Sequence, residues 1–322
     1  MNRRSKGEFS TASGSGTWIT LGFFLILALG SISCRQSDDP QGPHIIIYTS
    51  QDQIHAEPVF EAFGAATGIK VKALYDNESA KSMGLAKRLA AESRRPVCDV
   101  FWSNESLTMQ QLSHQGIVDS FDSFGYRMRV MIINTNAITP QQAPDSLHQW
   151  VEPKWREKCV MAYPLFGTTA THLLALRQKW GALSWSQWCQ GLKENEVRIV
   201  DGNSAVVRMV GSGDAWIGLT DSDDLAVGLS QGLPLMSIDL PGELCPISNT
   251  VGIVKGAPHP NLARSFAMFL RDSKILDSMV QSSALMSAQT IPETSNWLAP
   301  SWETLIEQSA EGLEQMRFLF MR

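Results

Sequence analysis

The sequence predicts an α/β fold in which mainly parallel sheets are flanked by helices. Three observations support this prediction. Short apolar runs alternate with stretches of helical periodicity, several of these runs are apolar throughout, and several end in small polar residues. A continuous apolar run is typical of a strand buried on both faces, and regular alternation of strand and helix is typical of a parallel sheet covered by helices.

The first part of the domain is predicted to alternate strand and helix three times. Apolar residues at helical spacing, Val59, Phe60 and Phe63, mark the first helix. Gly68 ends that helix, because glycine readily takes the left-handed conformation that closes a helix. The strands are expected at residues 44–50, 69–75 and 98–104, and the helices at residues 56–67, 79–93 and 107–115.

The second part continues with the same kinds of element. Residues 197–224 are predicted to form a strand, a helix, a glycine-rich turn and a further strand, and residues 260–282 have helical periodicity. The other strands are expected at residues 126–136, 158–164, 233–240 and 249–256, and the other helices at residues 167–181 and 185–195.

The composition is that of an ordinary globular protein. Of 322 residues, 43% are hydrophobic and 18% are charged, and the formal net charge is −5. There is no long basic run, so nucleic acid is not an expected partner. The chain also has no G-x-S-x-G elbow, no H-E-x-x-H motif and no Walker loop, so we do not expect an enzyme.

The N-terminus has the pattern of an export leader. Arg3, Arg4 and Lys6 precede an apolar run at residues 18–29, which is too short for a stable membrane span. The run leads to "GSISC", which resembles a bacterial lipoprotein cleavage site and predicts a leader at residues 1–33 and a lipidated Cys34. Residues 34–43 are then a polar tether between membrane and domain. The alternative is an ordinary secreted protein with an incidental cysteine.

Four further cysteines, Cys98, Cys159, Cys189 and Cys245, match no metal-binding spacing. A chain of this length does not need disulfides to fold. Buried free thiols are therefore favoured over disulfide pairs.

Polar residues gather at the ends of the predicted strands. Thr49 and Ser50 follow the first strand, Asn104 follows the third, and Asp221 follows the strand near residue 217. Ligands of open parallel sheets bind outside the carboxyl ends of the strands, so these four residues are candidate ligand contacts. The alternative is that each caps the helix that follows, since helix caps favour the same residue types.

Several stretches together resemble a known family. They are "IIIYTSQD", "DVFWSNE", "PLFGTTATH", "AWIGLTDSDD" and "SNTVGIVKGAPHP", in this order. In order and spacing they are similar to the extracellular solute-binding proteins of bacterial ABC importers, and most similar to the ferric-ion-binding branch. The resemblance implies a periplasmic, monomeric binder that closes two lobes on its ligand and delivers it to the transmembrane subunits of an ABC permease.

The resemblance also implies the lobes. Each lobe is a mainly parallel sheet flanked by helices, and crossing strands near residues 129–134 and 248–254 form the hinge. Lobe 1 is expected at residues 44–131 plus 249–322, and lobe 2 at residues 132–248.

In the ferric-binding branch two adjacent tyrosines hold the iron, and the matching positions here carry Ser222 and Asp223. The places of the other iron ligands carry Asp52 and the pair Asn104-Glu105. The resemblance therefore makes Asp52, Glu105 and Asp223 candidate metal ligands. The whole chain has only four tyrosines, so a site built from several tyrosines is hard to assemble.

The relatives' second feature is a small anion, phosphate or carbonate, that rests on a helix N-terminus. Thr168, Thr169 and Ala170 supply such a helix start here, and Asn203 matches a further anion contact. The free N–H groups and the dipole of a helix N-terminus favour negative charge. The alternative is that Thr168 only caps its helix.

Two ligands fit these patches. By resemblance, the first is a ferric ion carried with phosphate or carbonate, since carboxylates suit hard cations. The second is a small phosphorylated or phosphonate solute, zwitterionic and bound without metal. A third interpretation is that Asp221, Asp223 and Asp224 only provide negative charge at a helix N-terminus.

Overall fold

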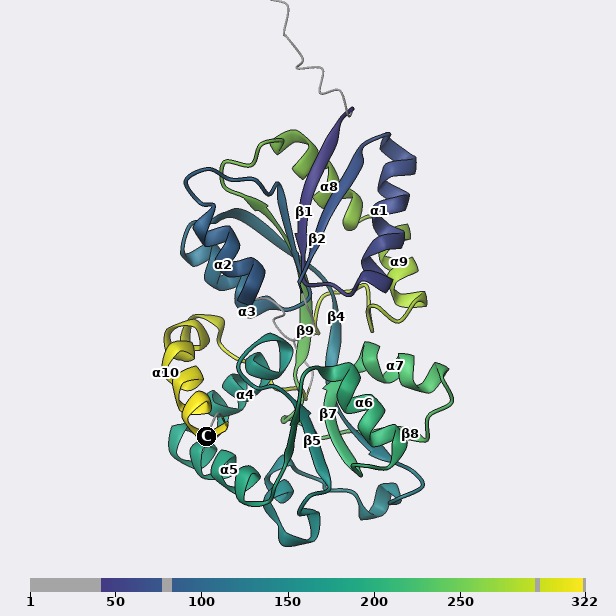
Figure 1. Ribbon diagram of the computed structural model, residues 1–322, viewed down its shortest axis with the longest axis vertical. Coiled ribbons are helices and arrows are strands. Elements are labelled where there is room, and N and C mark those ends of the chain that lie inside the picture. The colour runs from purple at the N-terminus through teal and green to yellow at the C-terminus, as the bar shows by residue number, and fades with distance from the viewer. Residues whose placement is uncertain (1–41, 77–82, 293–295, 321–322) are drawn as a thin grey trace, which may run out of the picture. The chain divides into compact units, whose positions relative to one another are not determined.

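The computed structural model describes residues 42–76, 83–292 and 296–320 (Figure 1). The strands are β1 (His44–Thr49), β2 (Lys70–Tyr75), β3 (Val100–Ser103), β4 (Val118–Asn134), β5 (Cys159–Ala162), β6 (Arg198–Val200), β7 (Ile217–Asp221), β8 (Leu235–Ile238) and β9 (Pro246–Val254). The helices are α1 (Gln53–Thr67), α2 (Met83–Ala91), α3 (Ser106–His114), α4 (Gly167–Trp180), α5 (Ala182–Glu194), α6 (Asn203–Ser212), α7 (Ser222–Ser230), α8 (Pro260–Leu270), α9 (Ser273–Gln281) and α10 (Trp302–Phe320). Three short 3-10 helices, η2 (Pro140–Gln142), η3 (Leu147–Val151) and η4 (Pro153–Trp155), precede β5.

The strands form two sheets that share β4. In one lobe, β1 pairs in parallel with β2 and β3, and β9 then pairs antiparallel with β3 and β4. In the other lobe, β5 pairs in parallel with β6 and β7, and β4 pairs antiparallel with β7 and β8. The predicted α/β fold with two lobes is therefore confirmed. The parallel strands lie toward the two ends of the strand order, and the antiparallel strands that join the lobes, β9 and β4, lie between them.

β4 is the crossing strand. Its first part, from Val118 to Met128, pairs with β9 in one sheet, and its second part, from Arg129 to Ile133, pairs with β7 in the other. Figure 1 shows β4 and β9 running between the upper group of helices and strands and the lower group. A strand shared in this way places its middle residues at the junction of the two lobes.

β4 begins at Val118, eight residues before the predicted start of this strand. Half of the residues that the sequence analysis left out are polar, but β9 pairs with this part of the strand, and tertiary pairing overrides strand propensity. A bulge between Phe124 and Tyr126 contains Gly125, which has a φ of +52°. A Cβ atom there would lie 2.6 Å from Cδ1 of Leu285, so glycine is needed at this bend.

Two helical features differ from the prediction. The stretch at residues 260–282 is broken into α8 and α9, because the Asp272 side chain accepts a hydrogen bond from the Lys274 N–H and starts a new helix. The sequence analysis did not predict α10. The start of the helix expected at residues 79–93 lies partly outside the described residues.

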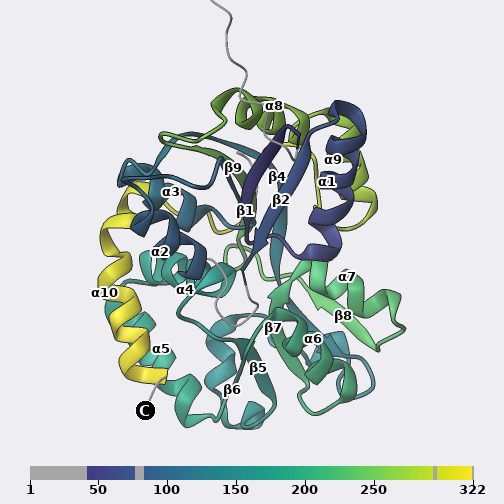
Figure 2. The same cartoon turned by 45° about the horizontal axis from the view of Figure 1, so that its top comes forward.

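Each lobe has its own apolar core. Phe63, Trp102 and Phe266 belong to the core around β1 and β3, and Leu173 and Trp185 belong to the core around β5 and β7. The core around β5 and β7 also includes Leu305 and Met316 of α10. Figure 2 shows α10, in yellow, running beside α4 and α5. The predicted boundaries between the lobes, at residues 131/132 and 248/249, stay a prediction. Helix α10 was expected in lobe 1, but it packs chiefly on the lobe 2 helices α4 and α5.

Cys98, Cys159, Cys189 and Cys245 are buried free thiols in the structure. Burial raises the pKa of each thiol, that of Cys245 to about 12, so these side chains behave as small apolar residues. The predicted leader at residues 1–33, Cys34 and most of the tether lie outside the described residues. Within the described ranges, no helix has the length and apolar character that crossing a membrane requires.

Candidate functional site

Two buried arginines lie where β4 passes from one sheet to the other. Arg127 and Arg129 are two residues apart on the strand, so their side chains point to the same side. Their exposed fractions are 2% and 0%. Burial of two guanidinium groups requires charged or polar partners close by.

The partners are the carboxylates that follow β7. Asp221 lies opposite Arg129 in the strand register, and its Oδ1 atom is 2.6 Å from Arg129 Nη1. Asp223, at the start of α7, places Oδ2 2.5 Å from Arg127 Nη1. Both carboxylates are buried. The acidic cluster that the sequence analysis singled out is thus largely neutralised by two arginines that it did not consider.

Residues expected to contact an anion are also bonded into this cluster. Thr168 Oγ1 donates to Asp221 Oδ2 at 2.8 Å, and Asn203 Nδ2 donates to the same oxygen at 3.0 Å. Arg129 Nη1 donates to Thr168 Oγ1 and to Asn203 Oδ1. The side chains of Thr168 and Asn203 therefore orient the Arg129–Asp221 pair. Because both side chains are already hydrogen-bonded, a ligand here would contact mainly the backbone around them.

The first-lobe candidates form a second hydrogen-bonded group. Ser50 Oγ donates to Asn104 Oδ1 at 3.0 Å, and the Thr49 hydroxyl accepts from the Gln51 N–H. Arg127 Nη2 donates to the carbonyl oxygen of Asn104 at 2.7 Å. Arg127 thus joins the β3–α3 connection of lobe 1 to Asp223 of lobe 2.

Glu105 has a structural task. It is the N-cap of α3, where its side chain accepts hydrogen bonds from the N–H groups of Leu107 and Thr108. It also accepts from Thr171 Oγ1 of α4 at 3.0 Å. Both carboxylate oxygens therefore have donors, and this geometry does not favour Glu105 as a metal ligand.

The charges in the cluster shift one another's pKa values. Burial alone would raise the pKa of Asp221, but Arg129 and Arg127 outweigh it and hold that pKa below its usual range. Burial raises the pKa of Asp223; Arg127 opposes the shift, and Asp221 and Asp52 add to it. Burial likewise opposes ionisation of Arg127, but Asp223 and Asp221 raise its pKa. Arg127 therefore stays a cation.

Several buried polar atoms of the site have no hydrogen-bond partner in the part of the chain that the structure describes. They are Nε of Arg127, Nε and Nη2 of Arg129, Oδ1 of Asp223 and both amide atoms of Gln51. Buried polar groups in proteins are normally satisfied by protein, water or ligand. Of the residues that carry these atoms, Arg127 lines one of two adjoining cavities and Asp223 and Gln51 line the other, so their unpartnered atoms are candidates for contact with a ligand or water.

Two neighbouring cavities open beside this cluster. The smaller one, about 30 Å³, is lined by Arg127, by the first residues of α4 and α6, and by the carboxylates of Asp52, Asp201, Asp221 and Asp224. The N-cap residues of these two helices, Phe166 and Gly202, make no side-chain cap hydrogen bond. The larger one has a volume of about 540 Å³. Asp52 and Asp224 line both, so the two cavities adjoin.

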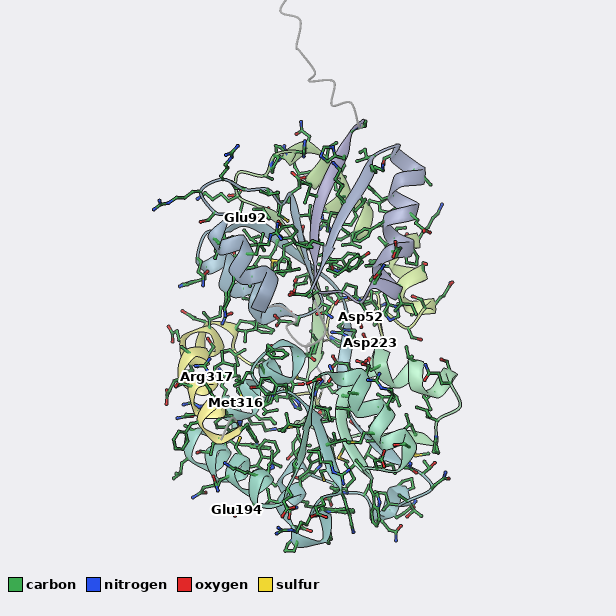
Figure 3. All side chains as sticks on the ribbon, in the orientation of Figure 1. Asp52, Glu92, Glu194, Asp223, Met316 and Arg317 are labelled. Atoms are coloured by element: carbon green, nitrogen blue, oxygen red, sulfur yellow. The ribbon has the colours of Figure 1, made fainter. Side chains whose placement is uncertain are left out.

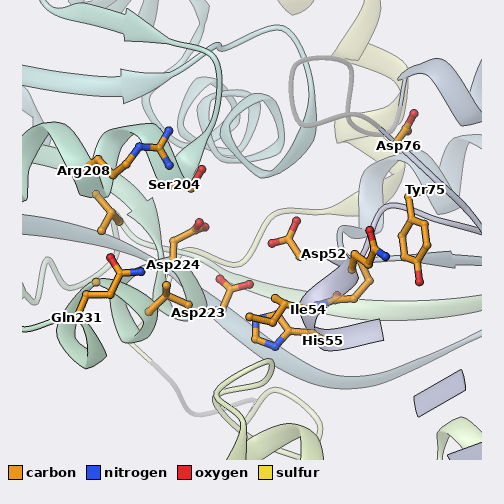
Figure 4. A pocket seen from close by; sticks show the side chains of 15 residues that line it. Asp52, Ile54, His55, Tyr75, Asp76, Ser204, Arg208, Asp223, Asp224 and Gln231 are labelled. Atoms are coloured by element: carbon orange, nitrogen blue, oxygen red, sulfur yellow. The ribbon is translucent and has the colours of Figure 1, made fainter. Parts of the chain in front are cut away.

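Asp52 and Asp223 come from opposite lobes and lie near each other at the junction (Figure 3). A close view of the larger cavity shows the carboxylates of Asp52, Asp223 and Asp224 directed toward the same space (Figure 4). Each of Asp221, Asp223 and Asp224 has an oxygen within 4.8 Å of the others. Carboxylates thus line both cavities, and the smaller cavity adds Arg127 and the starts of α4 and α6.

The matching family model describes a bacterial extracellular solute-binding protein, and it covers residues 50–278. The chain belongs to the bacterial extracellular solute-binding proteins. It is 26% identical over 171 residues to the major ferric iron-binding protein of Neisseria meningitidis, a stretch that covers 47% of this chain and 50% of that protein. The chain thus spans about half the length of the curated relatives it matches.

Solved structures share the two-lobed fold. Iron-bound HitA of Pseudomonas aeruginosa has a TM-score of 0.75 at 19% identity, covering 86% of this chain and 99% of that one. AfuA of Actinobacillus pleuropneumoniae, bound to fructose-6-phosphate, has a TM-score of 0.76 at 15% identity, covering 87% and 99%. Proteins of this fold therefore include both an iron binder and a binder of an organic phosphate.

The positions matched to the iron-binding tyrosines are occupied by residues with other bonds. Ser222 Oγ accepts a hydrogen bond from the Met128 N–H of β4, and Asp223 pairs with Arg127. Of the four tyrosines, Tyr75 and Tyr163 line the cavities. Burial raises the pKa of Tyr75 to about 12, so its phenol stays protonated near neutral pH.

His172 of α4 is buried within the electrostatic influence of Arg129 and Asp221. It should make the free energy of unfolding depend on pH. Its Nε2 is 2.6 Å from the Glu243 carbonyl oxygen, and burial together with Arg129 lowers its pKa from 6.5 to about 3. The unfolded chain then takes up a proton that the folded protein excludes, so stability falls as the pH drops below about 6.5. At pH 5 the loss should be about 2 kcal/mol.

The measurement is urea unfolding at pH 7 and pH 5. His172→Gln keeps a donor for the Glu243 carbonyl and should remove this part of the pH dependence, whereas exposed His114→Gln should keep it. An unchanged pH dependence in His172→Gln would contradict the assignment.

Proposed function

We propose that this solute-binding protein is the substrate-binding component of an ABC importer and captures a small phosphorylated or phosphonate solute without a metal ion. The observation that carries the proposal is the lining of the smaller cavity. Arg127 and the N-termini of α4 and α6 line one space. Of the four carboxylates that share this lining, Asp221 is paired with Arg129, and the others are Asp52, Asp201 and Asp224. Free N–H groups at a helix start and a buried guanidinium are the groups that proteins use to bind phosphoryl oxygens.

The residues expected to provide this site are Thr168, Thr169, Ala170 and Asn203. Thr168 and Thr169 are first-turn residues of α4, and Asn203 begins α6. At about 30 Å³ the smaller cavity has room for one or two waters. The smaller cavity must therefore widen to admit a phosphoryl group. We expect the two lobes to move apart slightly about the β4–β9 crossing and then to close around the bound ligand as a hinge.

A ferric ion with phosphate or carbonate is the second candidate. It is favoured by the close approach of Asp221, Asp223 and Asp224, and by the names of the relatives. It is disfavoured because Asp221 and Asp223 already pair with Arg129 and Arg127. A trivalent cation beside two buried guanidinium groups would be repelled, and Asp52 and Asp224 alone supply too few ligands.

The proposed cellular setting is supported by the family and by the N-terminal sequence. In this proposal the protein is exported, works as a monomer in the periplasm, and is held at a membrane through lipid on Cys34. It hands its ligand to the transmembrane subunits of the permease. Replacement of Cys34 by Ala should release the protein from the membrane fraction; retention there would contradict the anchor.

The test of the ligand class is a thermal melt of the metal-stripped protein. Alkyl phosphonates and sugar phosphates are added alone, and ferric citrate is added alone and together with phosphate. A ligand present at 100 times its Kd stabilises by about 2.7 kcal/mol, which corresponds to a rise in Tm of about 4–5 °C for a chain of this size. We expect this rise with an organic phosphate or phosphonate, unchanged by EDTA. A rise that requires iron and phosphate together would instead establish the second candidate.

A further inference from the structure

We propose that the larger cavity binds a primary ammonium group, so that the solute carries an ammonium and a phosphoryl or phosphonate group on one short molecule. This inference rests on the proposed function, because it places the anionic end of the same solute in the adjoining smaller cavity. It adds a requirement for positive charge that an ordinary sugar phosphate or alkyl phosphonate does not meet.

The charges that line the larger cavity favour a cation. Four carboxylates line it, against one guanidinium, that of Arg208. Asp223 and Asp224 come from α7, whereas Asp52 precedes α1 and Asp76 follows β2. In Figure 4, Arg208 lies on the wall beside Ser204, away from the space between Asp52 and Asp223. Asp223 pairs with Arg127, but the four carboxylates still outnumber the two guanidinium groups, so the lining carries a net negative charge.

Unpartnered acceptors provide the second observation. Asp223 and Gln51 line the cavity and are each 2% exposed. Oδ1 of Asp223 and Oε1 of Gln51 have no hydrogen-bond partner among the described residues. An ammonium group has three N–H donors and no acceptor, so it can satisfy a carboxylate and an amide oxygen at the same time. A neutral hydroxyl has one donor and would leave the carboxylates to repel one another.

A bound ammonium group would also favour closure of the two lobes, because the carboxylates beside it come from both. Asp52 belongs to one lobe and Asp223 to the other, and their charges interact, since Asp52 helps to raise the pKa of Asp223. Bringing two carboxylates together costs free energy that an ammonium between them removes. The cation would therefore hold the two lobes together while the phosphoryl group occupies the N-termini of α4 and α6.

The two ends of the solute must be close. Asp52 and Asp224 line both cavities, and Arg127 lines the smaller cavity while it pairs with Asp223 at the edge of the larger one. A linker of a few bonds is enough to place one charge in each. Rigid preorganisation of opposite charges at both ends gives specificity for a zwitterion over either singly charged analogue.

Isothermal titration of the metal-free full-length protein tests this with three probes of similar size. They are 2-aminoethylphosphonate, 2-hydroxyethylphosphonate and ethylphosphonate, with the corresponding phosphate esters as a second series. We expect the amine to bind at least about 30-fold more tightly than the other two, since a buried charge-assisted contact is lost in each. Asp52→Asn and Asp224→Asn should reduce this ratio by at least about tenfold. Asp277→Asn, on the exposed face of α9, should leave the ratio unchanged.

The outcomes separate the two proposals. If ethylphosphonate binds as tightly as the amine, the ammonium site is wrong and the phosphonate site stands. If the hydroxyl probe equals the amine, the cavity recognises a neutral polar group and the inference is wrong. If no probe of either series binds without metal, both the inference and the proposed function are overturned.

Discussion

Replacing Arg129 with methionine should lower the free energy of unfolding by about 3–5 kcal/mol. Arg129 is fully buried, and its Nη1 atom donates to Asp221, Thr168 and Asn203. Without the guanidinium, the buried Asp221 keeps only the longer ion pair with Arg127, at 3.5 Å, and loses its nearest cation. Removing one partner of a buried ion pair costs more than the loss of a single hydrogen bond. Urea unfolding at pH 7 measures the change.

A second substitution distinguishes loss of the charge pair from loss of packing. Arg129→Met combined with Asp221→Leu removes both charges and should recover much of the stability, because a buried ion pair can often be replaced by apolar groups. Arg94→Met on the exposed surface should change stability by no more than about 0.5 kcal/mol. A loss for Arg129→Met no larger than for Arg94→Met would contradict the prediction and would show that Arg127 alone compensates the charge of Asp221.

Replacing Arg127 with lysine should weaken binding of an organic phosphate or phosphonate by about 30-fold or more. Arg127 holds Asp223 through Nη1 and the Asn104 carbonyl through Nη2, and it lines the smaller cavity. Lysine keeps the positive charge but has a single nitrogen, so it cannot hold both lobes and face an anion with the same geometry. A loss of about 2 kcal/mol or more is typical when a buried charged contact is truncated.

Isothermal titration with the tightest-binding probe measures this effect, and a thermal melt of the free variant shows whether it folds. Arg264→Lys, on exposed α8, is the matched control and should bind as the original protein does. If the folded Arg127→Lys variant bound the probe with unchanged affinity, Arg127 would not be part of the binding site. The proposal of an anion site would then depend on the helix N-termini alone.

The order of strands and helices was largely predictable because several buried strands are apolar throughout and most helices have an apolar stripe. The exceptions have a common cause. The polar start of β4 is a strand because β9 pairs with it, and α10 is held by packing on α4 and α5. Neither partner is local in sequence, so no pattern within the segment could establish the contact.

The candidate site was predictable in location but not in its bonds. Thr168, Asn203, Asp221 and Asp223 do come together, but around the side chains of Arg127 and Arg129. The sequence contained one indication of this: "YRMRVMII" places two arginines two residues apart at the start of an apolar strand. Charged residues at such positions need buried partners, and the acidic run after Leu219 was available to supply them.

The sequence by itself determined which segments are strands or helices and that polar residues follow the strands, because side-chain periodicity and helix starts are local properties of the chain. The tertiary structure decided which of these polar residues neutralise one another. The charge left at the site depends on the distance between Asp223 of α7 and Arg127 of β4, residues far apart in the sequence. The electrostatic energy of a buried site changes steeply with such distances. Whether a carboxylate is available to a ligand or stabilises the fold therefore depends on its arginine partner, and not on the number of acidic residues in the sequence.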